Sequence, residues 1–364
     1  MRTVLFGVMA MAVWAGDRDA AIAANMRKMI DAGEVPGAVT VIATRSGVTH
    51  LGVIGHAETD QKRPLKKNSI FWIASMTKPI TAAAILMLQD EGKLSVDDPV
   101  AKYIPELKTP GMTLKHLLTH TSGMGEATAE ESKAAKTLAD LVPVHASKKP
   151  FFAPGAQWRY CQSGINTLGR IVEIVSNERF EVFLEKRFFK PLGMKDTTFF
   201  VTAKQLPRVV APARKTGDKL VTEPVSSLTE RFRYPAANGG LFSTGPDYAR
   251  FARMLLNGGE LNGKRYLSAK AIEQMASAQT GDLKAGFIPG HAWGLGVGVV
   301  REPQGQTAMS KPGTFGHGGA FGTQAWIDPQ SGVALILMVQ RANFKNSDDS
   351  PVRLAFQKAA MGAE

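Results

Sequence analysis

The sequence contains a single cysteine, Cys161, among 364 residues. One thiol cannot form an internal disulfide, so cysteine usage neither supports nor excludes an oxidising compartment. Low-complexity segments and internal repeats of fixed period are also absent, which argues against a solenoid or a propeller. Beyond the N-terminus, no apolar run reaches membrane-spanning length. With 44% hydrophobic residues, the chain can nevertheless bury a large core.

Acidic residues are in deficit, because 32 Asp and Glu residues stand against 44 Lys and Arg residues, for a formal net charge of +12. An excess of this size occurs in proteins that bind nucleic acid, but also in proteins with a solvated basic surface. The basic residues are dispersed. Pairs such as Lys66-Lys67 and Lys148-Lys149 stand alone, without a longer basic run or interleaved aromatic residues. We therefore expect no nucleic-acid partner.

The first 15 residues combine one positive charge at Arg2, a short apolar stretch and a small-x-small ending at Ala15. This pattern is typical of an export signal, although the segment is short for one, and the alternative is a buried N-terminal helix. We predict a signal peptide over residues 1–15 and therefore a periplasmic or secreted protein. If residues 1–15 are not a signal, the location is cytoplasmic.

Regular patterns gather at the two ends of the chain. Helix formers from Ala20 to Ala32 precede two strand-like runs around a turn, and near the C-terminus two further strand-like runs precede a helix that Pro351 opens. Mostly helical and loop sequence separates the two ends. We predict an α+β fold in which both chain ends build one antiparallel sheet flanked by helices, with a helical lobe inserted. The expected single domain covers 17–364, with a sheet lobe over about 17–75 and 290–364 and a helical lobe over about 76–289.

Ser75 and Lys78 stand three positions apart where an apolar helix begins. Positions i and i+3 share one face of a helix, so the hydroxyl and the amine can come within hydrogen-bond reach. A lysine activates a serine only when its pKa is depressed, and the apolar run behind the pair would bury that face. The competing interpretation is that Ser75 is an ordinary helix N-cap, since Ser-x-x-Lys alone is a short pattern.

Two further motifs accompany this pair. Residues 154–164 read PGAQWRYCQSG and residues 314–323 read TFGHGGAFGT. In order and spacing, the three motifs resemble those of class C β-lactamase-like serine hydrolases, a family that includes β-lactamases, D-peptidases and esterases. The resemblance covers roughly residues 20–360. It is supported by LLTHTSG at 117–123, GGLFSTG at 239–245 and LNGGELNG at 256–263.

The resemblance implies roles for individual residues. Ser75 would form an acyl-enzyme, and Lys78 and Tyr160 would share its proton, with Tyr160 passing that proton to the leaving group. A lysine ammonium near Tyr160 would favour phenolate, so the two groups should titrate together. The backbone N–H groups of Ser75 and Ala320 would form the oxyanion hole. Gln162, His317, Gly318 and Gly319 would contact the substrate, the two glycines by letting its backbone approach closely.

Two departures from the family pattern bear on the substrate. Gln162 stands where the family usually has asparagine, which displaces the amide by about one C–C bond. His317 stands where many relatives that process β-lactams have lysine, and a neutral imidazole attracts a substrate carboxylate only weakly. Cys161, next to Tyr160, is interpreted as a small buried residue rather than a nucleophile.

Several other patterns are incomplete. The stretch 258–264 imitates a P-loop, but Arg265 replaces the residue that would bind Mg²⁺. His116 and His120 have helical spacing without the Glu of the zinc signature, so we expect no metal. The glycines of 293–298 have the wrong spacing for a dinucleotide, and Gly-x-Ser-x-Gly of α/β-hydrolases is absent.

The sequence therefore predicts a serine hydrolase without a cofactor, acting on ester, amide or lactam carbonyls of small molecules, with a carboxylesterase-like activity favoured. The alternatives are a class C-type β-lactamase or D-Ala peptidase, a penicillin-binding or sensor module that is acylated with little turnover, and a structural lobe with a dead site.

Overall fold

The computed structural model describes the backbone of residues 2–60 and 62–362 and the side chains of residues 16–60 and 62–362. The first helix is α1 (Arg2–Asp31). The predicted signal peptide covers residues 1–15, which lie outside the described side chains, so it stays a prediction. Among the described residues, no helix combines the length and the apolar character that a membrane crossing requires.

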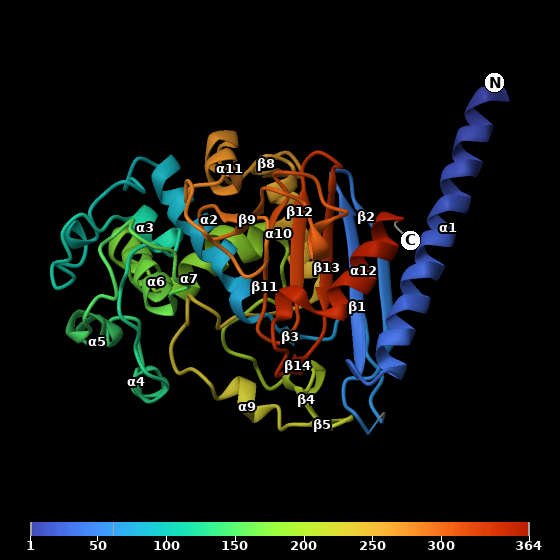
Figure 1. Ribbon diagram of the computed structural model, residues 1–364, viewed down its shortest axis with the longest axis horizontal. Helices are drawn as coiled ribbons and strands as arrows, with labels where there is room; N and C mark the ends of the chain where they lie inside the picture. Colours follow the sequence, from blue (N-terminus) through green and yellow to red (C-terminus); the bar gives the residue numbers. More distant parts are fainter. Residues whose placement is uncertain (1, 61, 363–364) are drawn as a thin grey trace.

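The main sheet has seven strands in the order β2-β1-β13-β12-β11-β10-β9, and each neighbouring pair is antiparallel (Figure 1). Val39 of β1 pairs with Met338 of β13. Segments from the two ends of the chain are therefore neighbours within one sheet, as the sequence predicts. The strands are β1 (Gly37–Thr44), β2 (Val48–Gly55), β9 (His291–Trp293), β10 (Gly298–Val300), β11 (Phe315–Gly318), β12 (Gln324–Asp328) and β13 (Val333–Met338).

Helices cover both faces of this sheet. Successive side chains of a strand point to opposite faces, and in β1 Val39 and Val41 join the large central core, whereas Ala38 and Ile42 join a smaller one. The smaller core includes residues of α1 and of α12 (Pro351–Met361), and α10 (Gly245–Leu256) packs against β1, β12 and β13. Because both of its faces are covered, β1 is apolar nearly throughout.

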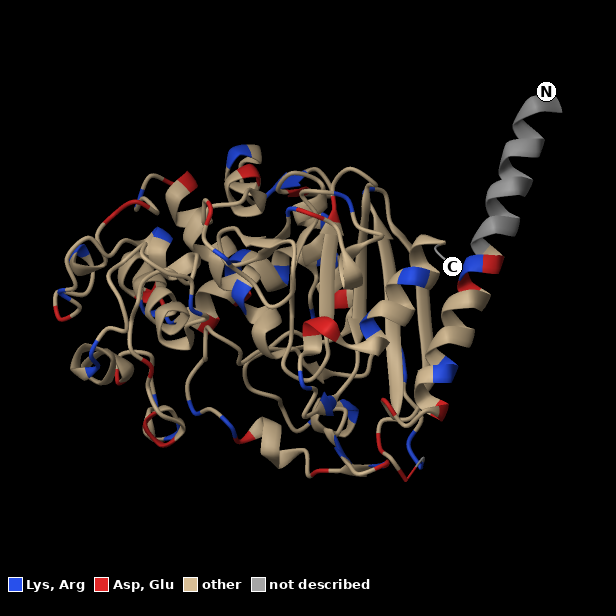
Figure 2. Cartoon of the chain, viewed as in Figure 1, with Lys and Arg blue, Asp and Glu red and all other residues tan. Residues whose placement is uncertain are grey.

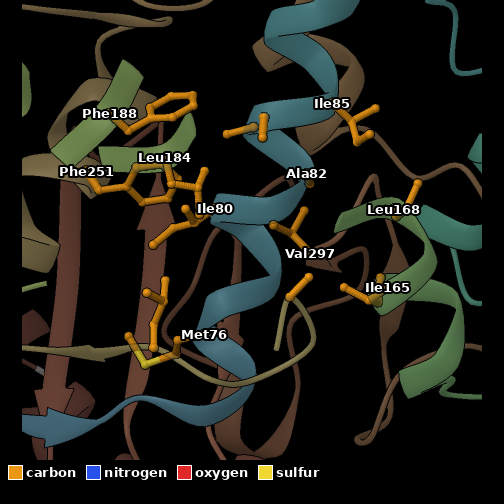
Figure 3. Close-up of a cluster of buried hydrophobic side chains, with 14 of the residues drawn as sticks. Met76, Ile80, Ala82, Ile85, Ile165, Leu168, Leu184, Phe188, Phe251 and Val297 are labelled. Atoms are coloured by element: carbon orange, nitrogen blue, oxygen red, sulfur yellow. The ribbon is translucent and has the colours of Figure 1, made fainter. Parts of the chain in front are cut away.

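The helical part of the molecule is organised around α2 (Thr77–Asp90), in which residues 77–88 are all buried. A helix that is buried all round has neighbours on every side. Figure 3 shows Ile80, Ala82 and Ile85 of α2 among side chains of other elements, including Ile165 and Leu168 of α6 (Gln162–Ser176). This packing fixes α2, and with it the site at its N-terminal end.

The other helices and strands are short. The helices are α3 (Leu114–Leu118), α4 (Ala129–Ala134), α5 (Leu141–Ser147), α7 (Phe180–Leu184), α8 (Lys190–Leu192), α9 (Ser226–Thr229) and α11 (Ala269–Ala276). The strands are β3 (Phe71–Trp72), β4 (Ala213–Thr216), β5 (Lys219–Thr222), β6 (Phe242–Ser243), β7 (Glu260–Leu261), β8 (Lys264–Arg265) and β14 (Arg341–Ala342). The short 3₁₀-helices are η1 (Ala74–Met76), η2 (Val100–Lys102), η4 (Leu206–Arg208), η5 (Gly305–Thr307) and η6 (Ser347–Asp349), and η3 (Glu185–Phe189) is a π-helix between α7 and α8.

The α+β fold predicted from the sequence is present, with its antiparallel sheet and its helices. The division into a sheet lobe and a helical lobe remains our proposal. One refinement follows from the packing, because α10 lies within the segment assigned to the helical lobe but covers a face of the sheet. Figure 2 shows Lys and Arg interspersed with Asp and Glu along the chain, in keeping with the dispersed charge of the sequence.

Candidate active site

Ser75 lies in the short 3₁₀-helix η1, which joins strand β3 to helix α2. It is partly exposed, whereas its neighbours from residue 71 to residue 80 are buried. The N-cap residues of η1 and α2 are Ile73 and Met76, and neither makes a side-chain capping hydrogen bond. Ser75 is therefore not the N-cap of either element. The ordinary interpretation of Ser-x-x-Lys as a helix start does not account for this serine.

Lys78 is fully buried one turn further along α2. Its Nζ lies 3.1 Å from Ser75 Oγ, 2.9 Å from Gln162 Oε1 and 2.6 Å from the carbonyl oxygen of Asn238. Burial lowers the pKa of Lys78 to about 7, and the negative charge of Glu126 opposes this shift without cancelling it. Near neutral pH the neutral amine is thus well populated, as a base for Ser75 requires.

Tyr160 reaches the same place from the loop before α6. The ring centroid of Tyr160 is 4.6 Å from Lys78 Nζ, and its O–H donates to His317 Nε2 at 3.3 Å. Burial raises the pKa of Tyr160 well above its ordinary value, although a hydrogen bond with Ser75 acts in the opposite direction. Both shifts therefore favour the neutral forms in the resting site, the amine of Lys78 and the phenol of Tyr160. This differs from the sequence expectation of an ammonium that promotes phenolate, because burial disfavours both charged forms.

His317 lies on β11, the strand beside η1. Its Nδ1 donates to the carbonyl oxygen of Gly318 at 2.6 Å, which leaves Nε2 as an acceptor for the Tyr160 hydroxyl. Burial, reinforced by the charge of Lys78, lowers the pKa of His317 to about 3. As the sequence predicts, this position brings no positive charge to the site near pH 7.

Gln162, the first residue of α6, keeps contact with the lysine despite its longer side chain. Its Oε1 accepts from Lys78 Nζ and also from Asn238 Nδ2, at 3.0 Å. The start of α6 is held by Glu126, whose carboxylate accepts from the backbone N–H groups of Gln162 and Ser163, at 2.6 and 2.8 Å. A carboxylate is favoured there because it caps the positive end of the helix.

The glycines that follow His317 are required by the protein itself. A Cβ on Gly319 would lie 2.1 Å from Thr323 Oγ1 and 2.6 Å from the carbonyl oxygen of Ile73, and a Cβ on Gly318 would lie 2.3 Å from Asp348 Oδ1. Close packing of β11 against its neighbours is a sufficient reason for both glycines. The sequence also predicts that these glycines let a substrate backbone approach; that role stays a prediction, and the packing of the protein requires the glycines in either case.

Aromatic rings and a polar groove adjoin the site. The ring of Tyr160 lies 4.8 Å from that of Phe287 and 6.0 Å from that of Trp293, and Trp158 lies 5.3 Å from Trp293. Phe287 is 38% exposed, so this aromatic cluster reaches the surface. A groove of about 1220 Å³ also reaches Gln162, and its lining includes Glu126, Asn238 and the segment 224–233 without Val225 and Leu228. The site therefore adjoins both an apolar aromatic surface and a mostly polar groove.

Other residues singled out in the sequence have structural roles. Cys161 is buried, as the sequence predicts, and its Sγ accepts from the N–H of Gly164 at 3.3 Å. Burial raises its thiol pKa to about 12, which is in keeping with the prediction that it is not a nucleophile. His116 caps α3, and His120 accepts from the N–H of Cys161. The P-loop-like stretch forms the hairpin β7–β8.

Two contributors to the site, Glu126 and Asn238, belong to none of the three sequence motifs. Glu126 follows the LLTHTSG motif, but only the fold brings it to the start of α6. Asn238 acts on Lys78 through its backbone carbonyl, which every residue carries, and its side chain donates to Gln162, which is distant in sequence, so neither contact gives a local signal. The residues that the sequence did identify in the three motifs, Ser75, Lys78, Tyr160, Gln162 and His317, are brought together by the fold.

A serine hydroxyl hydrogen-bonded to a buried lysine at the start of a helix, set beside an antiparallel sheet, is the architecture of a serine hydrolase, and the protein belongs to this class. The chain is a member of the Beta-lactamase family, whose model matches residues 22–360.

Known proteins that resemble the chain agree with this assignment. Protein Rv1367c of Mycobacterium tuberculosis is 31% identical, over 87% of this chain and 88% of its own length. Esterase EstB of Burkholderia gladioli is 25% identical, over 84% of this chain and 86% of its own length. The solved structure of EstCE1, described as a hydrolase with promiscuous acyltransferase activity, superposes with a TM-score of 0.83 at 22% identity, over 96% of this chain and all of that one. The resemblance and the fold predicted from the motifs are thereby confirmed.

Proposed function

We propose that the protein is a carboxylesterase-like hydrolase in which Ser75 is the nucleophile, Lys78 the base and Tyr160 the acid. The observation that carries this proposal is the set of three contacts around Lys78 Nζ. The oxygens of Gln162 and of the Asn238 carbonyl only accept, so a neutral amine gives both of its N–H groups to them. Its lone pair is then left for the proton of the Ser75 hydroxyl.

Acylation follows from this arrangement. Lys78 takes the Ser75 proton while Oγ bonds to the substrate carbonyl carbon, and the N–H groups of Ser75 and Ala320 receive the oxyanion. Apart from bonds inside helices and strands, neither N–H group has a backbone acceptor among the described residues. When the ester C–O bond breaks, Tyr160 protonates the leaving alkoxide and regains its proton from the Lys78 ammonium. The products of this half-reaction are an alcohol and the acyl-enzyme.

Deacylation is the same path in reverse with water in place of the alcohol. Tyr160 accepts a proton from the attacking water as its own proton passes to Lys78, and Lys78 returns that proton to Ser75 Oγ as the acyl bond breaks. His317 Nε2 accepts from the Tyr160 hydroxyl and so keeps it oriented between the two steps. The net reaction is ester plus water to acid plus alcohol, and it needs no metal or cofactor.

The activity should depend on pH through Lys78. Acylation requires the neutral amine, so we expect kcat/KM to rise about tenfold per pH unit below an apparent pKa of about 7 and to level off above it. The measurement is kcat/KM for a p-nitrophenyl ester from about pH 5 to about pH 9, corrected for spontaneous hydrolysis. His317, with its pKa near 3, should add no step in this range. A profile that keeps rising toward an ordinary lysine pKa would contradict the assignment of Lys78 as base.

The proposed substrate is a neutral ester. A fixed ammonium beside the site would attract the carboxylate of β-lactams and peptide C-termini, whereas His317 is uncharged and hydrogen-bonded to Tyr160. We expect kcat/KM for a short-chain p-nitrophenyl ester to exceed that for a chromogenic cephalosporin by at least about tenfold, or ~1.4 kcal/mol. Both substrates should be assayed at about pH 8 with one preparation.

The double variant His317→Lys with Gln162→Asn is the matched comparison. It should reduce the ratio of kcat/KM for the ester to kcat/KM for the cephalosporin. If the native protein prefers the cephalosporin, the carboxylesterase proposal falls and a β-lactamase replaces it. Release of one equivalent of product without steady turnover, with the acyl-enzyme detected by intact mass spectrometry, would instead indicate a penicillin-binding or sensor module.

A further inference from the structure

His120 has an unusual backbone conformation for its residue type. It follows α3 in the LLTHTSG motif, its φ is +60°, and it is completely buried. Residues other than glycine rarely adopt positive φ, and such conformations persist where the surrounding structure enforces them. The contacts that hold His120 in this conformation beside the site therefore indicate what the residue does.

The hydrogen bonds of His120 lie on either side of Tyr160. The carbonyl oxygen of His120 accepts from the N–H of Arg159 at 2.9 Å, and its Nδ1 accepts from the N–H of Cys161 at 3.1 Å. One residue thus fixes the backbone both before and after the tyrosine. Tyr160 itself lies in a loop, where no regular secondary structure holds it.

The ring of His120 also contacts Tyr160 directly. The two ring centroids are 4.5 Å apart, and Trp293 packs against the imidazole at 5.2 Å. Because Nδ1 accepts a backbone hydrogen bond, the proton of the neutral ring is on Nε2. Burial, helped by the nearby charge of Lys78, holds the pKa of His120 well below its ordinary value, so the ring remains an acceptor for Cys161.

We propose that His120 is a positioning residue for the reaction: its carbonyl, its Nδ1 and its ring together set the Tyr160 hydroxyl at the distance from Ser75 and His317 that proton transfer requires. This inference depends on the role of Tyr160 proposed above. A displacement of about 1 Å in such a group costs on the order of a hundredfold in rate.

A second buried histidine provides a matched control. His145 is buried in the same part of the molecule, its Nδ1 bonds to Thr167 Oγ1 at 3.2 Å, and its Nε2, like that of His120, has no partner within the described residues. His145 bonds to α6 well after Gln162 and makes no ring contact with Tyr160 among the described residues. Its replacement removes a comparable buried imidazole without touching the tyrosine.

The test compares kcat and KM of four variants with the native enzyme, using one p-nitrophenyl ester. His120→Leu should lower kcat about a hundredfold with little change in KM, because it removes the acceptor for Cys161. His120→Asn should stay within about tenfold of native, because asparagine tolerates positive φ and its Oδ1 can accept the same N–H. His120→Gln, whose amide extends beyond the Nδ1 position, should behave like His120→Leu. His145→Leu should leave kcat unchanged.

Introducing His120→Leu into the Tyr160→Phe variant tests the role of His120 separately from the proposed function of the site. His120→Leu should cause no further loss there, because it acts through the hydroxyl that is already absent. If His120→Leu retains native kcat, or lowers kcat equally with and without the hydroxyl, His120 is a structural residue and the inference is overturned. If Tyr160→Phe itself retains activity, the proposed function fails instead. Should His120→Leu not fold, His120→Gln decides by the same criteria.

Discussion

The variant Ser75→Ala should lose turnover of every ester by about 10⁴-fold or more, because no acyl-enzyme can form without the hydroxyl. It should fold normally. Ser75 caps neither η1 nor α2, so the change removes no capping bond, and we expect the free energy of unfolding to stay within about 1 kcal/mol of native. Steady-state assays, intact mass spectrometry after substrate exposure and a urea unfolding curve test these expectations.

Ser176→Ala is a suitable control, because it removes a serine hydroxyl from a helix at a position away from the site. Ser176 is the last residue of α6, and its hydroxyl donates to the carbonyl oxygen of Val172. It should keep native kcat. Normal turnover by Ser75→Ala, or a covalent adduct on that variant with the mass of the acyl group, would show that another residue is the nucleophile.

The second large effect should come from the proton-transfer groups. Lys78→Met and Tyr160→Phe should each lower kcat about 10³-fold, because general acid–base catalysis typically contributes 10²- to 10⁴-fold. Methionine keeps the buried stem and removes the amine. The carbonyl oxygen of Asn238 then loses its donor, but the chain no longer has to bury an amine, so the variant should fold.

The two losses should not multiply. Lys78 and Tyr160 act on the same proton, so the double variant should lose only about as much as the more damaged single variant. A double-mutant cycle on kcat, with each protein checked by a thermal melt, measures the coupling. Independent losses that multiply to about 10⁶-fold would contradict the shared proton path and leave Tyr160 with a role in binding alone.

Much of the fold could be predicted because local patterns determine it. The strands β1 and β13 read as apolar runs bounded by turns, and Pro351 opens α12, where a proline suits the first turn of a helix. The placement of α10 could not be predicted, because an amphipathic helix shows that one face is buried but not against which element.

The site also has one part that could be predicted from the sequence and one part that could not. Ser75 and Lys78 are one helical turn apart, so their contact follows from local geometry. Contacts from Gln162 and Asn238 to the lysine join segments distant in sequence, and the second of them uses a backbone atom. The pKa directions of Lys78 and Tyr160 depend on burial, which only the folded structure supplies.

The pairing of Val39 with Met338 has a consequence for how the molecule forms during synthesis. Strand β1 is translated before its neighbour β13, and the long segment between them, which carries α2 to α11, has to be made before the two strands can pair. Until then the β1–β2 hairpin has an open edge and an uncovered apolar face, which is marginally stable in water. Assembly of the sheet therefore waits for β13, and contacts of such high sequence separation make it slow. While the segment between β1 and β13 is being made, the nascent chain lacks its main sheet, and holding factors that bind unfolded segments have that long to act on it.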